Sequence, residues 1–313
     1  MSTPFRAECF GKLPLHGDFI RHRAGPELQE VDRWVQAGLL AVRGRSDWEQ
    51  AWPATPPLRF LRRYAASSRL LAGVIAPSRD SAGRDYPFLV AAVIEGKEVR
   101  RQPELAPLLC QPFFAAAEDV ALRSWDGAGY RDVQAAVDRI AGDLDGKAAE
   151  RRLGALLAET TFEQFVVDQL GDWDDRRFLL LANAASLLGP RSRPRFALRL
   201  PGGGEAAGAT ACWLALVTAL RGGAAGFGTL TTWSTGPGGK ESGLRLVLGD
   251  PAGDQFLPLV MSHLPSDACD LAKEGLDSPG LMQKARDRFG PLADPRTRLS
   301  ELAPKLAAAA RAS

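Results

Sequence analysis

The sequence has few of the residues on which metal, redox and nucleic-acid sites depend. It contains three histidines, and its four cysteines lie far apart, so no Cys-x-x-Cys pair can form. Its 39 basic residues nearly balance 37 acidic ones, and a net charge of +2 does not favour nucleic-acid binding. These shortages predict a protein without a metal or cofactor.

Long apolar runs are also missing. The longest, Phe88 to Ile94 and Ala211 to Leu220, are shorter than a membrane span. Met1 to Phe10 has no basic segment followed by an apolar run, so we expect no secretory signal. The sequence therefore predicts a cytoplasmic protein that inserts in no membrane.

What is present is an ordinary globular composition, 45% hydrophobic and 24% charged over 313 residues. Apolar patterns predict strands at both ends of the chain around a helical middle, which favours a layered α/β or α+β domain over a barrel. The expected strands are Phe5 to Cys9, Leu58 to Tyr64, Leu70 to Ala76, Pro87 to Ile94, Arg195 to Leu200, Thr229 to Ser234 and Leu244 to Leu248. The apolar segment Phe256 to Met261 is expected to close the core. The expected helices are Pro26 to Val42, Leu105 to Trp125, Tyr130 to Leu144, Arg151 to Leu170, Arg177 to Leu188 and Ala211 to Leu220.

Two polar loops concentrate glycine, charge and histidine. Lys12 to Arg23 and Pro77 to Tyr86 each follow a predicted strand, so each is expected at a carboxyl edge of the sheet, where α/β proteins usually bind ligands. We expect Asp18 or Asp80 to pair with Arg84 and so to bring the loops together.

A hydrolase is one alternative for these loops. Ser78 would be the nucleophile and His16 the base, with Asp18 or Asp80 orienting the base. Ser78 is not in a Gly-x-Ser-x-Gly elbow, however, so the strained turn that exposes such a nucleophile is not indicated.

Metal or anion binding are further alternatives. His16, Asp18, His22 and Asp80 match no standard zinc or calcium spacing. Arg79 and Arg84 could hold an anion such as phosphothreonine, or could pair with neighbouring aspartates.

Two tryptophans outside these loops, Trp48 and Trp52, stand among acidic residues and prolines. That setting predicts a partly exposed binding surface.

The two loops, with Trp34 on the helix between them, resemble the TagF (ImpM) family of bacterial type VI secretion system-associated proteins over roughly the first 95 residues. The motif positions are Gly11, Lys12, Pro14, Gly17, Asp18, Ser78, Asp80, Gly83, Arg84 and Pro87. The resemblance implies a three-layer αβα sandwich with a central mixed sheet, here with a helical C-terminal extension. It divides the chain into a TagF-like region at 1–140, further helices and strands at 141–262, and an extension at 263–313.

The resemblance also implies a function without catalysis. Family members are cytoplasmic post-translational repressors of type VI secretion, linked to the forkhead-associated scaffold protein Fha. We therefore expect a non-enzymatic regulator that binds a type VI secretion component, with a hydrolase or phosphoesterase using Ser78, His16 and Asp18 or Asp80 as the alternative.

Overall fold

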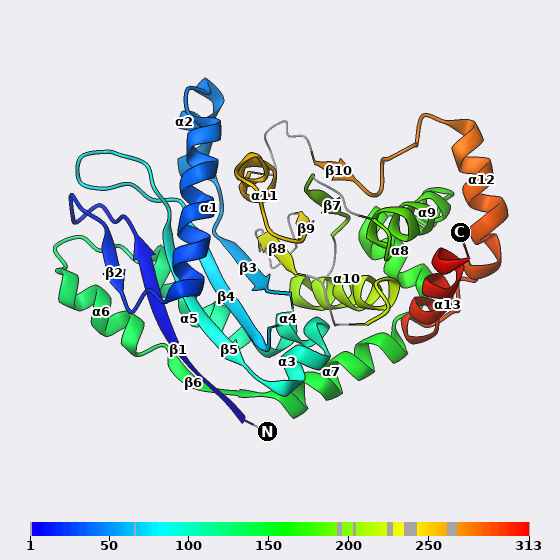
Figure 1. Ribbon diagram of the computed structural model, residues 1–313, viewed down its shortest axis with the longest axis horizontal. Coiled ribbons are helices and arrows are strands. Elements are labelled where there is room, and N and C mark those ends of the chain that lie inside the picture. The colour runs from blue at the N-terminus through cyan, green and yellow to red at the C-terminus, as the bar shows by residue number, and fades with distance from the viewer. Residues whose placement is uncertain are drawn as a thin grey trace.

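A large mixed β-sheet runs through the computed structural model, which describes residues 2–65, 67–192, 196–202, 205–223, 228–234, 243–261 and 268–312. The strands lie in the order β10-β7-β9-β8-β3-β4-β5-β1-β2, and β6 pairs with the outer side of β1 (Figure 1). Their bounds are β1 (Ser2–Gly11), β2 (Ile20–His22), β3 (Leu58–Arg63), β4 (Arg69–Ala76), β5 (Phe88–Glu95), β6 (Ala141–Asp145), β7 (Leu198–Leu200), β8 (Thr229–Ser234), β9 (Leu244–Leu248) and β10 (Cys269–Asp270).

Helices cover both faces of this sheet. The helices on one face are α1 (Pro26–Val42), α2 (Ser46–Ala51) and α11 (Phe256–Val260), and α1 crosses in front of the central strands (Figure 1). The other helices are α3 (Lys97–Arg101), α4 (Ala106–Leu109), α5 (Gln111–Leu122), α6 (Tyr130–Asp138), α7 (Gly146–Glu159), α8 (Phe162–Leu170), α9 (Arg176–Leu188), α10 (Ala206–Leu220), α12 (Pro279–Phe289) and α13 (Leu299–Arg311). The predicted α/β sandwich is confirmed.

Strand periodicity explains why the molecule has two cores. In β4, Leu71 and Ile75 point to the core under α1, whereas Leu70, Ala72 and Val74 point to the larger core on the opposite face. Because both faces are buried, the central strands are apolar throughout, as their sequence predicts.

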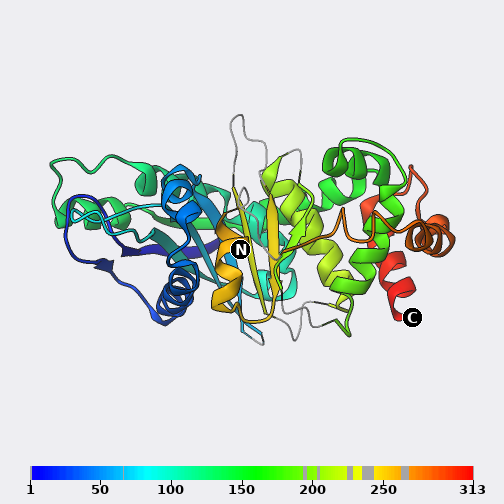
Figure 2. The same ribbon diagram turned by 90° about the horizontal axis from the view of Figure 1, so that it is seen from above.

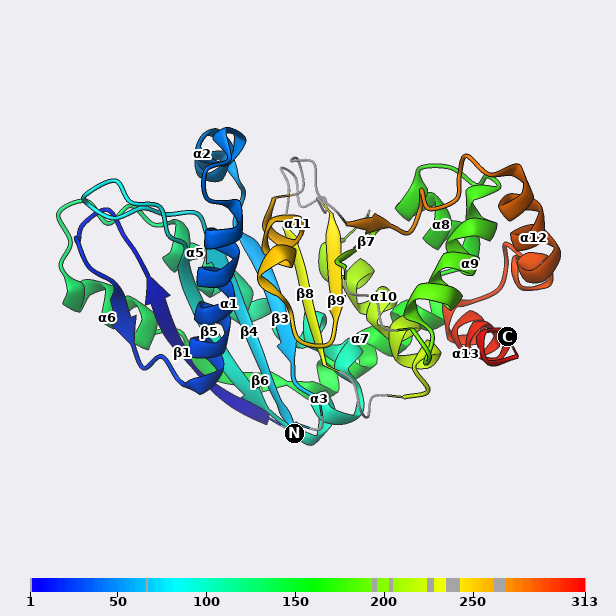
Figure 3. The ribbon, with the colours of Figure 1, turned by 45° about the horizontal axis from the view of Figure 1, so that its top comes forward.

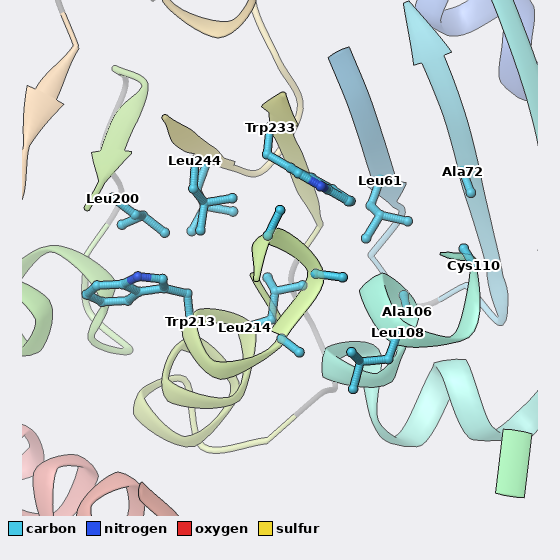
Figure 4. Packing of buried hydrophobic residues seen from close by; sticks show 14 of the residues in the cluster. Leu61, Ala72, Ala106, Leu108, Cys110, Leu200, Trp213, Leu214, Trp233 and Leu244 are labelled. Carbon is cyan, nitrogen blue, oxygen red and sulfur yellow. The ribbon is translucent and has the colours of Figure 1, made fainter. Parts of the chain in front are cut away.

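The larger core extends from the sheet into α10. Trp213 and Leu214 of this helix pack below Leu200 and Leu244, as Figure 4 shows. Every described position of α10 from Ala206 to Leu214 is buried, which is why this helix is apolar all round.

Phe256 to Met261 is buried in the core as expected, and its first five residues form α11. Several sequence predictions of local structure are wrong. The helix expected over Arg151 to Leu170 is two helices, α7 and α8. The helix expected over Tyr130 to Leu144 ends at Asp138, and β6 follows. Exposed β6 carries no alternating apolar pattern, because only Leu144 is buried, so periodicity did not reveal it.

Another wrong prediction is the strand over Arg195 to Leu200, which begins only at Leu198. Phe196, expected on one strand face with Leu198 and Leu200, lies before the strand and is 37% exposed. Arg195 is outside the described residues.

The described C-terminal residues contribute to the sheet and to the larger core. β10 pairs in parallel with β7, and Leu299, Leu302 and Leu306 of α13 are buried in the cluster that contains α10. Figures 2 and 3 show α12 and α13 beside α9, at the end of the molecule away from β2.

In the described ranges, no single helix is long and apolar enough to span a membrane. By length and composition, one pair of helical segments meets the criteria for a span only when taken together, and the two segments, Pro103–Leu109 and Gln111–Leu122, are bent by 55° relative to each other.

Candidate functional site

Sheet topology places the two motif loops at the same edge. β1 and β4 are both antiparallel to β5, so they run in the same direction and their carboxyl ends meet. The backbone N–H of Ser81 donates to the His16 carbonyl at 3.1 Å and joins the loops directly. The predicted contact between the loops is confirmed.

Asp80 is the centre of this contact. Its Oδ2 accepts hydrogen bonds from Lys12 Nζ and Arg84 Nε, both at 2.7 Å, and its Oδ1 accepts from the backbone N–H groups of Ala82 at 3.0 Å and Arg84 at 2.9 Å. Asp80 is 3% exposed and Lys12 7% exposed, so this is a buried ion pair. The Lys12 hydrogen bond, reinforced by those from Arg84, holds the pKa of Asp80 well below its usual range.

Arg84 lies on the solvent-exposed side of this contact and binds both loops. Its Nη2 donates to the Gly17 carbonyl at 2.5 Å, so one guanidinium binds both loops. The expected ion pair therefore forms with Asp80 as the carboxylate, whereas Asp18 lies exposed on the surface of the first loop.

At two motif positions, Gly11 and Gly83, the backbone conformation requires glycine. Gly11 has φ +139°, and a Cβ there would lie 2.1 Å from the carbonyl oxygen of Pro87. Gly83 has φ +79°, the left-handed conformation that closes the turn from Asp80, whose carbonyl accepts the Gly83 N–H at 2.9 Å. The buried Pro87 backbone thus packs against Gly11, while Pro14 lies on the exposed loop.

A group of three aromatic side chains, Phe10, Phe19 and Tyr86, packs beside the loop contact. Phe19 stacks on Phe10 at 5.1 Å and meets Tyr86 edge-on at 4.8 Å, and Lys12 Nζ lies 5.1 Å from the Phe19 ring centre. Phe19 is nevertheless 43% exposed, so the motif edge presents an aromatic side chain to solvent.

Asp32 anchors this group to α1 and was not found by sequence reasoning. The Tyr86 hydroxyl donates to Asp32 Oδ1, and Gln36 Nε2 donates to Asp32 Oδ2 at 3.0 Å. Burial and the Asp32 hydrogen bond raise the pKa of Tyr86. The sequence did contain a signal for Asp32, because its carboxylate lies between Leu28 and Val35 on the apolar stripe of the helix. A charged group in such a position needs a buried partner.

Ser78 and His16 do not form a nucleophile–base pair. The Ser78 carbonyl accepts from Tyr86 N at 3.0 Å and Trp52 Nε1 at 3.4 Å, and His16 Nδ1 accepts the Asp18 N–H at 3.1 Å. In the described part of the chain no hydrogen bond joins Ser78 Oγ to His16, and the Asp80 carboxylate is bound by Lys12 and Arg84.

Two further loop residues pair with carboxylates. Arg79 Nη2 lies 2.9 Å from Asp85 Oδ1, so both arginines of the second loop pair with aspartates of that loop. His22 Nε2 lies 2.6 Å from Asp138 Oδ1, and this hydrogen bond connects β2 to α6. Across the residues that the structure describes, no three His, Cys, Asp or Glu side chains gather as metal ligands.

The expectation that Trp48 and Trp52 form a partly exposed surface is wrong. They are 6% and 1% exposed and stack on each other with ring centres 4.6 Å apart, and the ring of Phe256 in α11 lies 5.9 Å from that of Trp48. Their spacing of four places both on one helical face, which is the pattern of a core contact.

The fold and this edge define an α/β protein in which two polar loops contact each other around one buried carboxylate. Residues 8–140 match the family model described as the TagF N-terminal domain, type VI secretion system-associated. The chain therefore carries a TagF N-terminal domain, as the motif resemblance predicts, and this domain indicates a type VI secretion-associated protein.

Two other comparisons add little. A solved structure, PA0076 from Pseudomonas aeruginosa PAO1, matches at 23% identity and a TM-score of 0.37, over 43% of this chain and 62% of that one. None of the curated proteins compared with the chain matches it.

Proposed function

We propose that the protein is a non-enzymatic, post-translational repressor of type VI secretion that acts in the cytoplasm by binding another component. The match of residues 8–140 to a secretion-associated domain supports this proposal most strongly. The loop contacts support it too, because Asp80, Lys12 and Arg84 bind one another rather than projecting into an open reaction site.

The partner we propose is the forkhead-associated scaffold Fha, and the proposed binding surface is the motif edge. The exposed part of Phe19, with Asp18 and the 62% exposed Arg84 side chain beside it, offers an aromatic centre and charges of both signs. Aromatic residues and arginine are enriched among residues that dominate protein–protein binding. Ion pairs inside the loops hold this surface in one conformation before binding, which lowers the entropic cost of association.

Overproduction in a secretion-competent bacterium tests repression. Wild-type protein is expected to lower effector release to background, and Arg84→Ala to relieve that block, since it removes the guanidinium that joins Gly17 of the first loop to Asp80. Arg131→Ala, an exposed arginine on α6, is the matched control and should repress fully. Effector in the medium and protein in the cells are measured by immunoblot. Unchanged secretion on overproduction of an abundant, folded wild type would contradict the proposal.

The same secretion assay distinguishes the proposed non-enzymatic repressor from the hydrolase or phosphoesterase alternative. If Ser78 were a nucleophile, Ser78→Ala would abolish function while leaving stability unchanged. We expect Ser78→Ala to repress as strongly as wild type, because the Ser78 contacts with Tyr86 and Trp52 are made by its backbone carbonyl.

A further inference from the structure

A hollow of about 520 Å³ lies where the helices α9 and α13 both end. Its described lining comes from the last turn of α9 with the segment that follows it, from Arg288 of α12, and from Ala310 and Arg311 of α13. Figure 1 shows these three helices at the end of the molecule opposite β2. The hollow is therefore separate from the loops around Asp80.

The charged residues in the described lining are all arginines. Arg191, Arg288 and Arg311 belong to three different segments of the chain, and all three are exposed to solvent. No carboxylate of the described residues forms an ion pair with any of them. Three positive charges thus surround one accessible hollow without a described counter-charge.

The nearby helix ends account for only part of this charge. The C-terminal end of a helix carries roughly half a negative charge, so the ends of α9 and α13 together offset about one of the three positive charges. Arg288 contributes to this pairing, because its Nη2 donates to the Ala309 carbonyl at 2.9 Å. About two positive charges remain, and the binding of an anion between them would relieve their mutual repulsion.

The turn that carries Arg191 is held in place by another arginine, Arg221. Its Nη1 donates to the carbonyl of Gly189 at 2.7 Å and to that of Ser192 at 3.1 Å. The N–H of Ser192 also donates to the Gly189 carbonyl, at 3.1 Å. These two carbonyl oxygens, which would otherwise repel an anion, are therefore already bound by donors.

We propose that this hollow binds a phosphate monoester, with the phosphoryl group among the guanidinium groups of Arg191, Arg288 and Arg311. A phosphate monoester carries a charge of about −1.5 to −2 at pH 7 and three acceptor oxygens, which suit the remaining positive charge and the paired N–H donors of a guanidinium. A carboxylate brings a smaller charge and fewer oxygens. The volume exceeds that of a phosphoryl group, so the organic part of the ester lies in the hollow as well, against Pro190 and Ala310. This site does not rest on the function proposed for the motif loops.

The probes are glycerol phosphate, which is a free small molecule, and a capped Gly-phosphoserine-Gly peptide, which represents a phosphorylated protein. Each is titrated into the full chain at constant ionic strength, and NMR follows the backbone amide of Ser192, which donates to Gly189. At least one probe should shift this amide saturably, and the tighter one identifies the source of the ligand. Glycerol and the unphosphorylated peptide should give no saturable shift, and acetate should bind several-fold more weakly. No saturable shift by either phosphate, or equal binding of acetate or of an unphosphorylated counterpart, overturns the proposal.

Two of the arginines can be changed without loss of a described side-chain bond. Arg191→Gln and Arg311→Gln each remove one charge from the hollow, and neither side chain makes a hydrogen bond or ion pair in the described structure. Each is expected to weaken binding of the tighter phosphate probe about tenfold or more, the loss typical of a charge-assisted hydrogen bond. Arg296→Gln, at an exposed arginine outside the hollow, is the matched control and should bind as wild type. Unchanged affinity in either folded variant, or an equal loss in Arg296→Gln, overturns the proposal. Neither result bears on repression by the motif edge, which the secretion assay tests.

Discussion

Gly11→Ala is expected to destabilise the protein by about 4 kcal/mol or more, a loss confined to a few mechanisms such as severe overlap or a forbidden backbone. The added methyl would lie 2.1 Å from Pro87 O and 2.8 Å from Phe88 Cα. Both are backbone atoms of the chain leading into β5, which pairs with Gly11 itself, so neither can move without breaking the sheet. The φ of +139° adds strain for any residue with a Cβ.

Gly17→Ala is the matched control, because Gly17 is the next motif glycine along the chain and lies in the loop that follows Gly11. Gly17 has an ordinary φ, and its Cβ would meet only Ser81 Oγ, at 3.6 Å. Its effect should lie within about 0.5 kcal/mol of zero. Chemical denaturation of both variants checks the pair. Similar losses of unfolding free energy at the two positions would contradict the claim that Gly11 is required for the close approach to Pro87.

Asp80→Asn is expected to lower the melting temperature by about 5 °C or more, because it leaves the buried Lys12 ammonium without its counter-charge. Lys12→Met in the same background should recover part of the loss, since the unpaired charge is then gone. Equal melting temperatures for Asp80→Asn and wild type would contradict the central place of this carboxylate in the loop contact.

The loss caused by Asp80→Asn should also depend on pH. The pKa of Asp80 is lowered in the folded state, so its ionised form stabilises the fold fully above its unfolded pKa of about 4. As the pH falls below that value, the unfolded chain takes up a proton at Asp80 before the folded protein does, so the stability advantage of wild type over Asp80→Asn decreases. Thermal unfolding from pH 7 to pH 3 measures this difference. An advantage that stayed constant over this range would contradict the lowered pKa.

Much of the motif edge was predictable from sequence. Buried strands ending at Ala76 and near Gly11, each followed by a polar loop, placed the loops at one edge, and residue chemistry suggested an aspartate paired with Arg84. Sequence left Asp18 and Asp80 equivalent. Only the fold distinguishes them, since Asp80 lies inside the turn beside Lys12 whereas Asp18 points outward.

Other features depend on contacts between distant segments and leave little local pattern. β6 is a strand because the first half of β1 offers it a free edge, and its own residues are polar and mostly exposed. Trp48 and Trp52 are buried because α11, some two hundred positions later in the chain, places Phe256 against them.

Calorimetric titration of purified Fha into the full chain tests the central claim, that the interlocked motif edge is a protein-binding surface. Asp18 is the residue to change, because it is exposed there and its side chain makes no described ion pair that the fold would lose. We predict saturable binding to wild type, binding at least about tenfold weaker to Asp18→Lys, and wild-type affinity for Glu150→Lys on α7. No binding of Fha to wild type, or equal affinities for all three proteins, would contradict the account.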